Sequence, residues 1–155
     1  MATYNFLTIW KFNAPLEEVY AAIHDADNYH LWWKGQSKVE SIQKGDALGI
    51  GAVKKFRTKS FLPYTLTYTG TVREVVPLKK VVGTTVGELE GTGTWIFEYN
   101  NGITTVKYYW QVKTNSRLMN FFTPVLKPLF AWNHDVVMRW GGEGLAKYLK
   151  CDLVS

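Results

Sequence analysis

The chain of 155 residues is 46% hydrophobic and 20% charged, which predicts one globular domain over residues 1–155 and excludes a disordered composition. Its net charge of +5 comes from the segment between Lys34 and Lys59, where seven basic residues meet two acidic ones. Their alternation with apolar residues favours a solvated sheet face, the alternative being a surface for nucleic acid or lipid headgroups. The single Cys151 excludes an intramolecular disulfide, and no run approaches the ~18 apolar residues of a membrane span, so we expect a cytoplasmic protein.

Local signals along the chain predict one strand, two short helices and then six strands. Pro15 suits the first position of the first helix, and Asp25 or Asp27 is placed to cap the second. Asn101 and Gly102 favour a type I′ hairpin between the last two strands, so the sheet is expected to be an antiparallel meander. The strands are predicted over residues 4–12, 39–44, 52–58, 64–75, 79–86, 92–99 and 103–113.

The C-terminal part is expected to contain a short helix after Ser116, a kink at Pro124 and Pro128, and one long helix that ends at Leu149. At about 100° per residue, the apolar face of this helix carries a titratable group, His134. The other residues of this face are Leu126, Phe130, Val137, Gly141, Leu145 and Tyr148, and the opposite face carries Asp135, Arg139, Glu143 and Lys150.

This order of elements describes a helix-grip fold of the α+β class. In such a fold a curved antiparallel sheet of about seven strands wraps around a long C-terminal helix, and here two short helices follow the first strand. Because a glycine inside a helix costs about 1 kcal/mol relative to alanine, Gly141 and Gly144 predict a close approach of the long helix to the sheet. A strongly curved sheet and a straight helix do not match in shape, which predicts a cavity between them.

Motifs spread over nearly the whole chain resemble those of a known family. They are Gly49-x-Gly51, Leu62-Pro63-Tyr64, the run from Gly87 to Trp95, Tyr109-Trp110-x-Val112 and Trp132-Asn133-His134-Asp135. In these motifs the chain is similar to the polyketide cyclase/dehydrase-like branch of the SRPBCC superfamily, whose fold is START-like and birch-pollen-allergen-like. The resemblance implies a deep apolar cavity for a lipid, sterol, polyketide or similar ligand, in a superfamily of carriers, cyclases, ring hydroxylase domains and chaperone co-activators.

Side chains that share the inward face of a predicted strand or of the long helix form a candidate ligand site. Most are apolar and a few carry polar tips, which is the usual composition of a small-molecule pocket. They are Tyr64, Leu66, Tyr68, Trp95, Phe97, Tyr108, Trp110, Phe130, Asn133, His134, Val137 and Met138. A register error of one residue would turn a strand's set outward.

The histidine of the long helix has three interpretations. His134 is a core residue held by a structural hydrogen bond from a tyrosine or a backbone carbonyl, a ligand contact, or a proton-transfer group. Asp135 is not expected to be its hydrogen-bond partner, because neighbours on a helix point about 100° apart, whereas Asn133 is placed to orient that partner or a ligand carbonyl. If the cavity catalyses a reaction, Tyr64 or Tyr108 is the candidate donor to an enolate oxygen.

Other chemistry-bearing patterns are weak. Glu88 and Glu90 form either an acid/base pair or, as the neighbouring Gly87 and Gly91 favour, part of a solvated turn. The chain lacks zinc-ligand spacing, a complete dinucleotide or phosphate loop, and a nucleophile elbow. The sequence therefore predicts no metal and no cofactor.

We expect a protein that binds one hydrophobic small molecule in the cavity, as a carrier or sequestering protein, and that does not bind nucleic acid. The alternative function is a polyketide cyclase/aromatase or dehydratase that acts in the same cavity by acid/base chemistry. A third is transient contact with a membrane surface through apolar residues that alternatively form a lid over the cavity. These residues are Phe61, Leu62, Phe121 and Phe122.

Overall fold

One curved sheet and one long helix make up most of the structure. The computed structural model describes residues 3–60, 65–114 and 123–154, with the backbone alone for 123–126. The strands are β1 (Thr3–Phe12), β2 (Glu40–Gln43), β3 (Val53–Thr58), β4 (Leu66–Val76), β5 (Lys80–Gly87), β6 (Leu89–Asn100) and β7 (Ile103–Thr114). The helices are α1 (Leu16–His24), the 3-10 turn η1 (Ala26–Asn28), α2 (Tyr29–Trp32) and α4 (Thr123–Tyr148).

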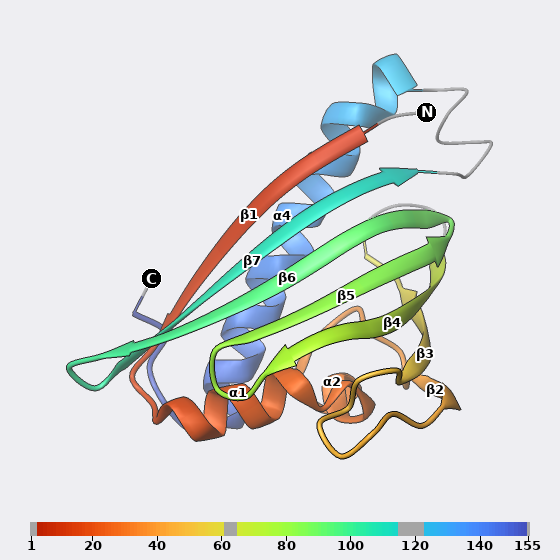
Figure 1. Cartoon of the computed structure of the whole chain (residues 1–155). Coiled ribbons are helices and arrows are strands. Elements are labelled where there is room, and N and C mark those ends of the chain that lie inside the picture. The colour runs from red at the N-terminus through yellow and green to blue at the C-terminus, as the bar shows by residue number, and fades with distance from the viewer. Residues whose placement is uncertain (1–2, 61–64, 115–122, 155) are drawn as a thin grey trace.

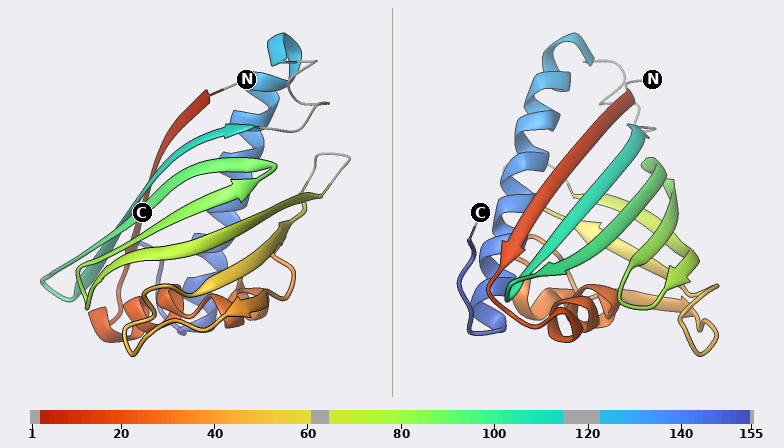
Figure 2. Two further views of the ribbon diagram at one scale, coloured as in Figure 1. Left: turned by 45° about the vertical axis from the view of Figure 1, so that its right-hand side comes forward. Right: turned by 60° about the vertical axis from the view of Figure 1, so that its left-hand side comes forward.

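The predicted helix-grip fold is confirmed. All strand pairs are antiparallel and the strands follow the order β1-β7-β6-β5-β4-β3-β2, so the meander from β2 to β7 ends beside β1. Figures 1 and 2 show the sheet curling past α4, which lies along its concave side, while α1 and α2 close one end. At the β6–β7 hairpin, Asn101 and Gly102 have φ angles of 51° and 80°, as a type I′ turn requires.

The largest differences from the predicted boundaries lie at the starts of β6 and α4. β6 begins at Leu89, because the strand pairs with β7 up to the Leu89–Thr114 pair, whereas the sequence placed its start at residue 92. α4 includes Pro128, although the main body of the helix was predicted to follow it. The N–H that Pro128 lacks would have bonded to residue 124 in the first helical turn, so the helix loses one terminal hydrogen bond. The helix predicted after Ser116 lies outside the described residues.

Two indole side chains, Trp10 of β1 and Trp33 just after α2, donate hydrogen bonds to backbone carbonyls of α4. The Trp33 indole N–H donates to the Val137 carbonyl at 2.8 Å, and the Trp10 indole N–H donates to the Met138 carbonyl at 3.1 Å. A Cβ atom on Gly141 would lie 2.6 Å from the Trp33 ring and 2.9 Å from the Trp10 ring. Gly141 therefore allows two indoles to reach the helix backbone, which confirms its predicted close approach.

The second helical glycine meets a different neighbour from the one predicted. A Cβ atom on Gly144 would lie 1.8 Å from the backbone carbonyl oxygen of Trp32, in α2. The predicted contact with the sheet is therefore wrong for Gly144, because the backbone at the end of α2 is what this turn of α4 meets. Tyr148 is also not part of the buried face: it is 47% exposed, whereas Leu145 is fully buried. Three residues advance about 300°, which places Tyr148 about 60° from Leu145 on a helix end.

The core consists of two clusters. The larger one packs α1, α2 and the C-terminal half of α4 against the sheet, and its centre includes Phe12, Val19 and Leu145. The smaller one contains Trp110 and Phe130 and lies at the other end of the sheet. Side chains from both clusters border the cavity described below.

Candidate functional site

A cavity of about 250 Å³ lies between the concave face of the sheet and α4. Its lining includes the predicted site residues Leu66, Tyr68, Trp95, Tyr108, Trp110, Phe130, Asn133, His134, Val137 and Met138. Phe97 is not among the lining residues: its ring packs edge-on against Tyr20 of α1, with 5.1 Å between ring centroids. Tyr64 lies outside the described residues. The parity of the strands and the helical spacing thus bring most of the predicted residues together around one space.

Three neighbouring strands present glycines to the cavity. Gly70 of β4, Gly83 of β5 and Gly93 of β6 line the cavity, and Gly83 pairs directly with Gly93. A Cβ atom on Gly70 would lie 2.9 Å from the Phe56 ring, and one on Gly93 would lie 2.5 Å from the Tyr108 hydroxyl. Those two glycines therefore make room for aromatic rings that lie across the sheet.

Gly83 has a different role in the cavity floor. A Cβ atom there would meet only the Thr71 carbonyl oxygen, at 3.4 Å, among the described atoms within 4 Å. The space above Gly83 is therefore open to a guest. Sequence reasoning missed all three glycines, although their alternation with inward-facing side chains was visible.

Flat aromatic side chains form the walls on the sheet side. Trp95 and Tyr108 stack with ring centroids 4.0 Å apart and an interplanar angle of 25°. Phe56 and Tyr68 stack at 5.4 Å and 14° on the opposite part of the sheet. Offset-stacked rings present large apolar faces, so the walls favour a planar guest.

Sequence reasoning also missed three lining residues on β3, one of which is Thr58. Lys54 and Phe56 both line the cavity, although the basic segment was expected to form a solvated face. That expectation is wrong for Lys54, whose side chain is only 18% exposed, and holds for Arg57, which is exposed. The alternation of Lys54, Phe56 and Thr58 on one face of β3 was the available signal.

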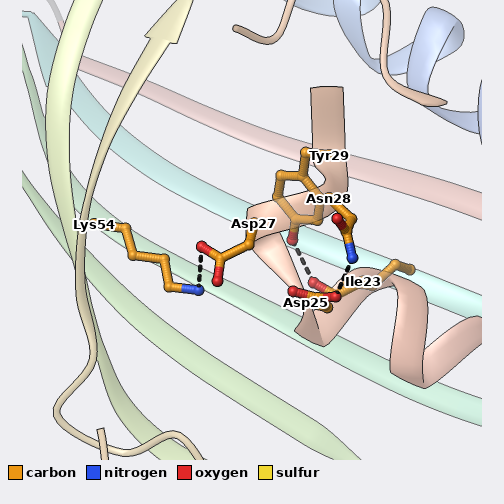
Figure 3. A network of polar contacts seen from close by, with 6 residues as sticks. All are labelled: Ile23, Asp25, Asp27, Asn28, Tyr29 and Lys54. Atoms are coloured by element: carbon orange, nitrogen blue, oxygen red, sulfur yellow. Dashed lines mark hydrogen bonds and ion pairs between the residues drawn. The ribbon is translucent and has the colours of Figure 1, made fainter. Parts of the chain in front are cut away.

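The rim of the cavity near α1 is closed by polar contacts. Lys54 Nζ lies 2.9 Å from Asp27 Oδ1, across the gap between β3 and η1 (Figure 3). His24 Nε2 lies 2.8 Å from the Leu48 carbonyl oxygen, which joins α1 to the loop before β3. These two contacts connect the helical segment to the β2–β3 region on one side of the cavity.

The predicted capping roles of the two aspartates are not observed. Asp25 occupies the N-cap position of η1, but within the described residues its carboxylate accepts from Asn28 Nδ2 rather than from a helix N–H. Asp27 is paired with Lys54 instead. Beside them the Tyr29 hydroxyl donates to the Ile23 carbonyl, so this corner of the cavity is held by side-chain contacts (Figure 3).

Glu88 and Glu90 do not border the cavity, within the described residues. Glu88 Oε1 accepts from the Thr67 N–H at 3.2 Å, and Glu90 lies 3.7 Å from Lys113 Nζ. Glu90 belongs to β6, so its placement in a solvated turn was wrong, because β6 begins earlier than predicted. An acid/base pair acting on a guest is therefore not formed by these residues.

His134 lies in the middle of the helix side of the cavity. Its ring stacks on Phe6 of β1, with centroids 3.8 Å apart and an interplanar angle of 10°. Nδ1 is 3.9 Å from Asp135 Oδ1, too far for a hydrogen bond. Neither ring nitrogen has a hydrogen-bond partner among the described residues. The interpretation that a structural hydrogen bond from one of these residues holds His134 is therefore wrong.

Burial lowers the pKa of His134 from 6.5 to about 4, because the charged imidazolium loses its hydration. The side chain is only 10% exposed. The imidazole is consequently neutral at neutral pH, with one nitrogen as donor and the other as acceptor.

This pKa shift has a measurable consequence for stability. Above pH 6.5 His134 is neutral in both the folded and the unfolded chain and adds no pH dependence. Between pH 6.5 and 4 the unfolded chain binds the proton more tightly, so the free energy of unfolding falls, by about 2 kcal/mol at pH 5. We expect His134→Phe to abolish this part of the pH dependence, measured by urea denaturation between about pH 4.5 and 8. A variant that loses stability in parallel with the wild type over that range would contradict the assignment.

Asn133 and Tyr108 are further polar residues of the lining. Asn133 is buried, and its Oδ1 accepts from Ser60 Oγ at 2.5 Å, so Ser60 rather than His134 fixes its orientation. Burial raises the pKa of Tyr108 well above its ordinary value, which keeps this hydroxyl protonated. Within the described residues no three His, Cys, Asp or Glu side chains gather as a metal site would need.

A curved antiparallel sheet that grips a long helix over an apolar cavity defines a helix-grip protein. Residues 12–132 match the family described as polyketide cyclase / dehydrase and lipid transport. The chain belongs to this family, within the SRPBCC superfamily. No curated protein shows significant sequence similarity to the chain.

Solved structures share the fold at low sequence identity. The Zhui aromatase/cyclase from Streptomyces sp. R1128 matches with a TM-score of 0.79 and 11% identity, over 96% of this chain and 94% of its own. The protein TTHA0849 from Thermus thermophilus matches with a TM-score of 0.74 and 13% identity, over 94% and 99% of the two chains. Ara h 8.0201 matches with a TM-score of 0.62 and 15% identity, over 94% and 99%. None of the described helices has the length and apolarity to cross a bilayer.

Proposed function

We propose that the protein binds one hydrophobic small molecule in the cavity between sheet and helix and acts as its carrier or sequestering protein. The observation that carries the proposal is the apolar cavity of about 250 Å³. An apolar cavity of about 150 Å³ is large enough for benzene, so this one has room for about two fused rings. Removal of the guest from water would contribute about 25 cal/mol per Å² of apolar surface.

The family supports this proposal, because its description includes lipid transport. The proposed ligand contacts are the predicted residues that line the cavity, together with Phe56 and Trp33. For the compartment we propose the cytoplasm, because the single cysteine, Cys151, is a free thiol.

The test is a titration of the protein with naphthalene, followed through the tryptophan indole N–H signals in NMR spectra. Trp33, Trp95 and Trp110 line the cavity, whereas Trp132 and Trp140 do not belong to its described lining. We expect the first three signals to shift with saturation and the last two to serve as controls. Native mass spectrometry of freshly purified protein adds the mass of any co-purifying guest. Equal shifts at all five indoles, or none, would contradict an internal site.

The second candidate is a polyketide cyclase/aromatase or dehydratase. The observation that favours it is the neutral imidazole of His134, which faces the same cavity as the Tyr108 hydroxyl. A general base works best with a pKa near the operating pH, and a pKa of about 4 makes His134 a weak one, so we rank the carrier first. Product formation from an aromatic polyketide that is lost in His134→Ala would establish the enzyme and overturn the carrier proposal.

Membrane contact through Phe61, Leu62, Phe121 and Phe122 stays a prediction, because these residues lie outside the described ones. Flotation with anionic liposomes tests it directly. Protein that stays in the bottom fraction at low salt would remove this function.

A further inference from the structure

Two buried polar groups on the cavity wall lack a hydrogen-bond partner among the described residues. Both ring nitrogens of His134 and the Thr85 Oγ1 atom are buried without a hydrogen bond to any described residue, and both residues line the cavity. Buried polar groups in native proteins are almost always hydrogen-bonded. Two other polar lining side chains differ from them, since Asn133 is bonded to Ser60 and Lys54 is paired with Asp27.

His134 lines the cavity, but its two ring nitrogens have almost no accessible surface, so a small movement of the ring must accompany contact with a guest hydroxyl. One face of the imidazole is covered by Phe6 at 3.8 Å. Phe130 and Met138 lie one helical turn before and after it, and both also line the cavity. These neighbours are apolar, and Asn133, the other polar residue on this side of the cavity, already bonds to Ser60 through its Oδ1.

The charges around the cavity exclude a guest that is itself charged at this point. Among the described lining residues there is no carboxylate. The cation Lys54 lies on β3, whereas His134 stacks on Phe6 of β1, and these two strands lie toward opposite edges of the sheet. Lys54 is moreover neutralised by Asp27 at 2.9 Å. An ionised group beside His134 would be a buried charge without a partner, which is costly. A neutral hydroxyl, in contrast, donates to the acceptor nitrogen of a neutral imidazole.

We propose that His134 selects an uncharged, planar ligand that carries a hydroxyl group, and that this hydroxyl donates to the acceptor nitrogen of the imidazole. The proposal rests on the function proposed above and specifies the ligand class for that cavity. His134 is then a specificity-determining residue, whether the protein carries its ligand or transforms it.

Four matched probes test this inference: naphthalene, 2-naphthol, 2-methoxynaphthalene and 2-naphthoate. They share one ring system but differ in charge and in the ability to donate a hydrogen bond. We expect the wild type at neutral pH to bind 2-naphthol about tenfold more tightly than naphthalene or 2-methoxynaphthalene, and 2-naphthoate most weakly, as measured by calorimetry. His134→Phe keeps a flat ring against Phe6 and should bind naphthalene at least as well, while losing the preference for 2-naphthol.

The outcomes separate this inference from the proposed function. Equal binding of 2-naphthol and 2-methoxynaphthalene by the wild type would overturn the hydrogen bond and leave the apolar cavity as the binding site. A preference for 2-naphthol that persists in His134→Phe would assign it to another residue and overturn the role of His134. Tightest binding of 2-naphthoate would overturn charge selection. Failure of all four probes would overturn the proposed function itself. The wild-type comparison decides between hydroxyl and ether even if the variant does not fold.

Discussion

Gly144→Ala should lower the free energy of unfolding by about 3 kcal/mol or more, although alanine is the better helix former. The added methyl group would lie 1.8 Å from the backbone carbonyl oxygen of Trp32, and a backbone atom cannot move aside as a flexible side chain can. Overpacking costs typically about 1–3 kcal/mol and sometimes more, whereas the gain in helix propensity is only about 1 kcal/mol. Urea denaturation followed by circular dichroism measures the difference.

Gly142→Ala is the matched control in the same helix. A Cβ atom there would meet the Trp10 indole at 3.0 Å, so this side chain must move by a few tenths of an ångström, whereas Gly144 meets a backbone atom at 1.8 Å. We expect its free energy of unfolding to stay within about 1 kcal/mol of the wild type. If Gly144→Ala were as stable as Gly142→Ala, the contact between α4 and α2 would be wrong.

The fold was predictable because its signals are local. The turn at Asn101 and Gly102 and the long apolar stripe through Leu145 each mark an element without knowledge of its neighbours. Pro15 marks the start of α1, but it occupies the N-cap, and Leu16 holds the first helical position that was predicted for Pro15. The contact of Gly144 was not predictable in the same way. It depends on where α2 is placed, and α2 spans only Tyr29–Trp32, which is too short for any periodicity to reveal.

The candidate site was predictable where side-chain alternation alone decides orientation. Trp95, Tyr108 and Trp110 face the cavity as strand parity indicated. Phe97 has the same parity as Trp95 but lies farther along β6, where α1 already covers the sheet. Alternation along a strand predicts which face of the sheet a side chain occupies, but it does not predict how far along the strand the cavity extends.

The role of the cavity-lining glycines could not be predicted from the sequence of a single strand. Gly83 matters because it lies opposite Gly93, and this pairing depends on the register of β5 against β6. Cross-strand register is a tertiary property that turns and neighbouring strands determine together. The same holds for Lys54, whose inward position follows from its ion pair with Asp27 as well as from parity.

Gly83→Leu should abolish binding of naphthalene, with a loss of at least about 100-fold, while the protein remains folded. Its side chain would enter the open space above β5, where the Thr71 carbonyl oxygen, at 3.4 Å, is the one described atom within 4 Å of an added Cβ atom. The added carbon atoms would occupy volume that a guest of two rings needs in a cavity of about 250 Å³. The melting temperature should not fall, because glycine is unfavourable inside a strand and a filled cavity gains apolar contacts.

The control for Gly83→Leu is Val86→Leu on the same strand. Val86 is 59% exposed and, three residues away, points to the opposite face of the sheet, so its substitution adds apolar volume outside the cavity. We expect this variant to bind naphthalene as the wild type does. Gly83→Ala should fall between the two, because a single methyl group takes less of the space. Unchanged affinity in Gly83→Leu would show that naphthalene binds elsewhere, and the carrier proposal would then lose its site, since the hollow above Gly83 would have no role in holding the guest.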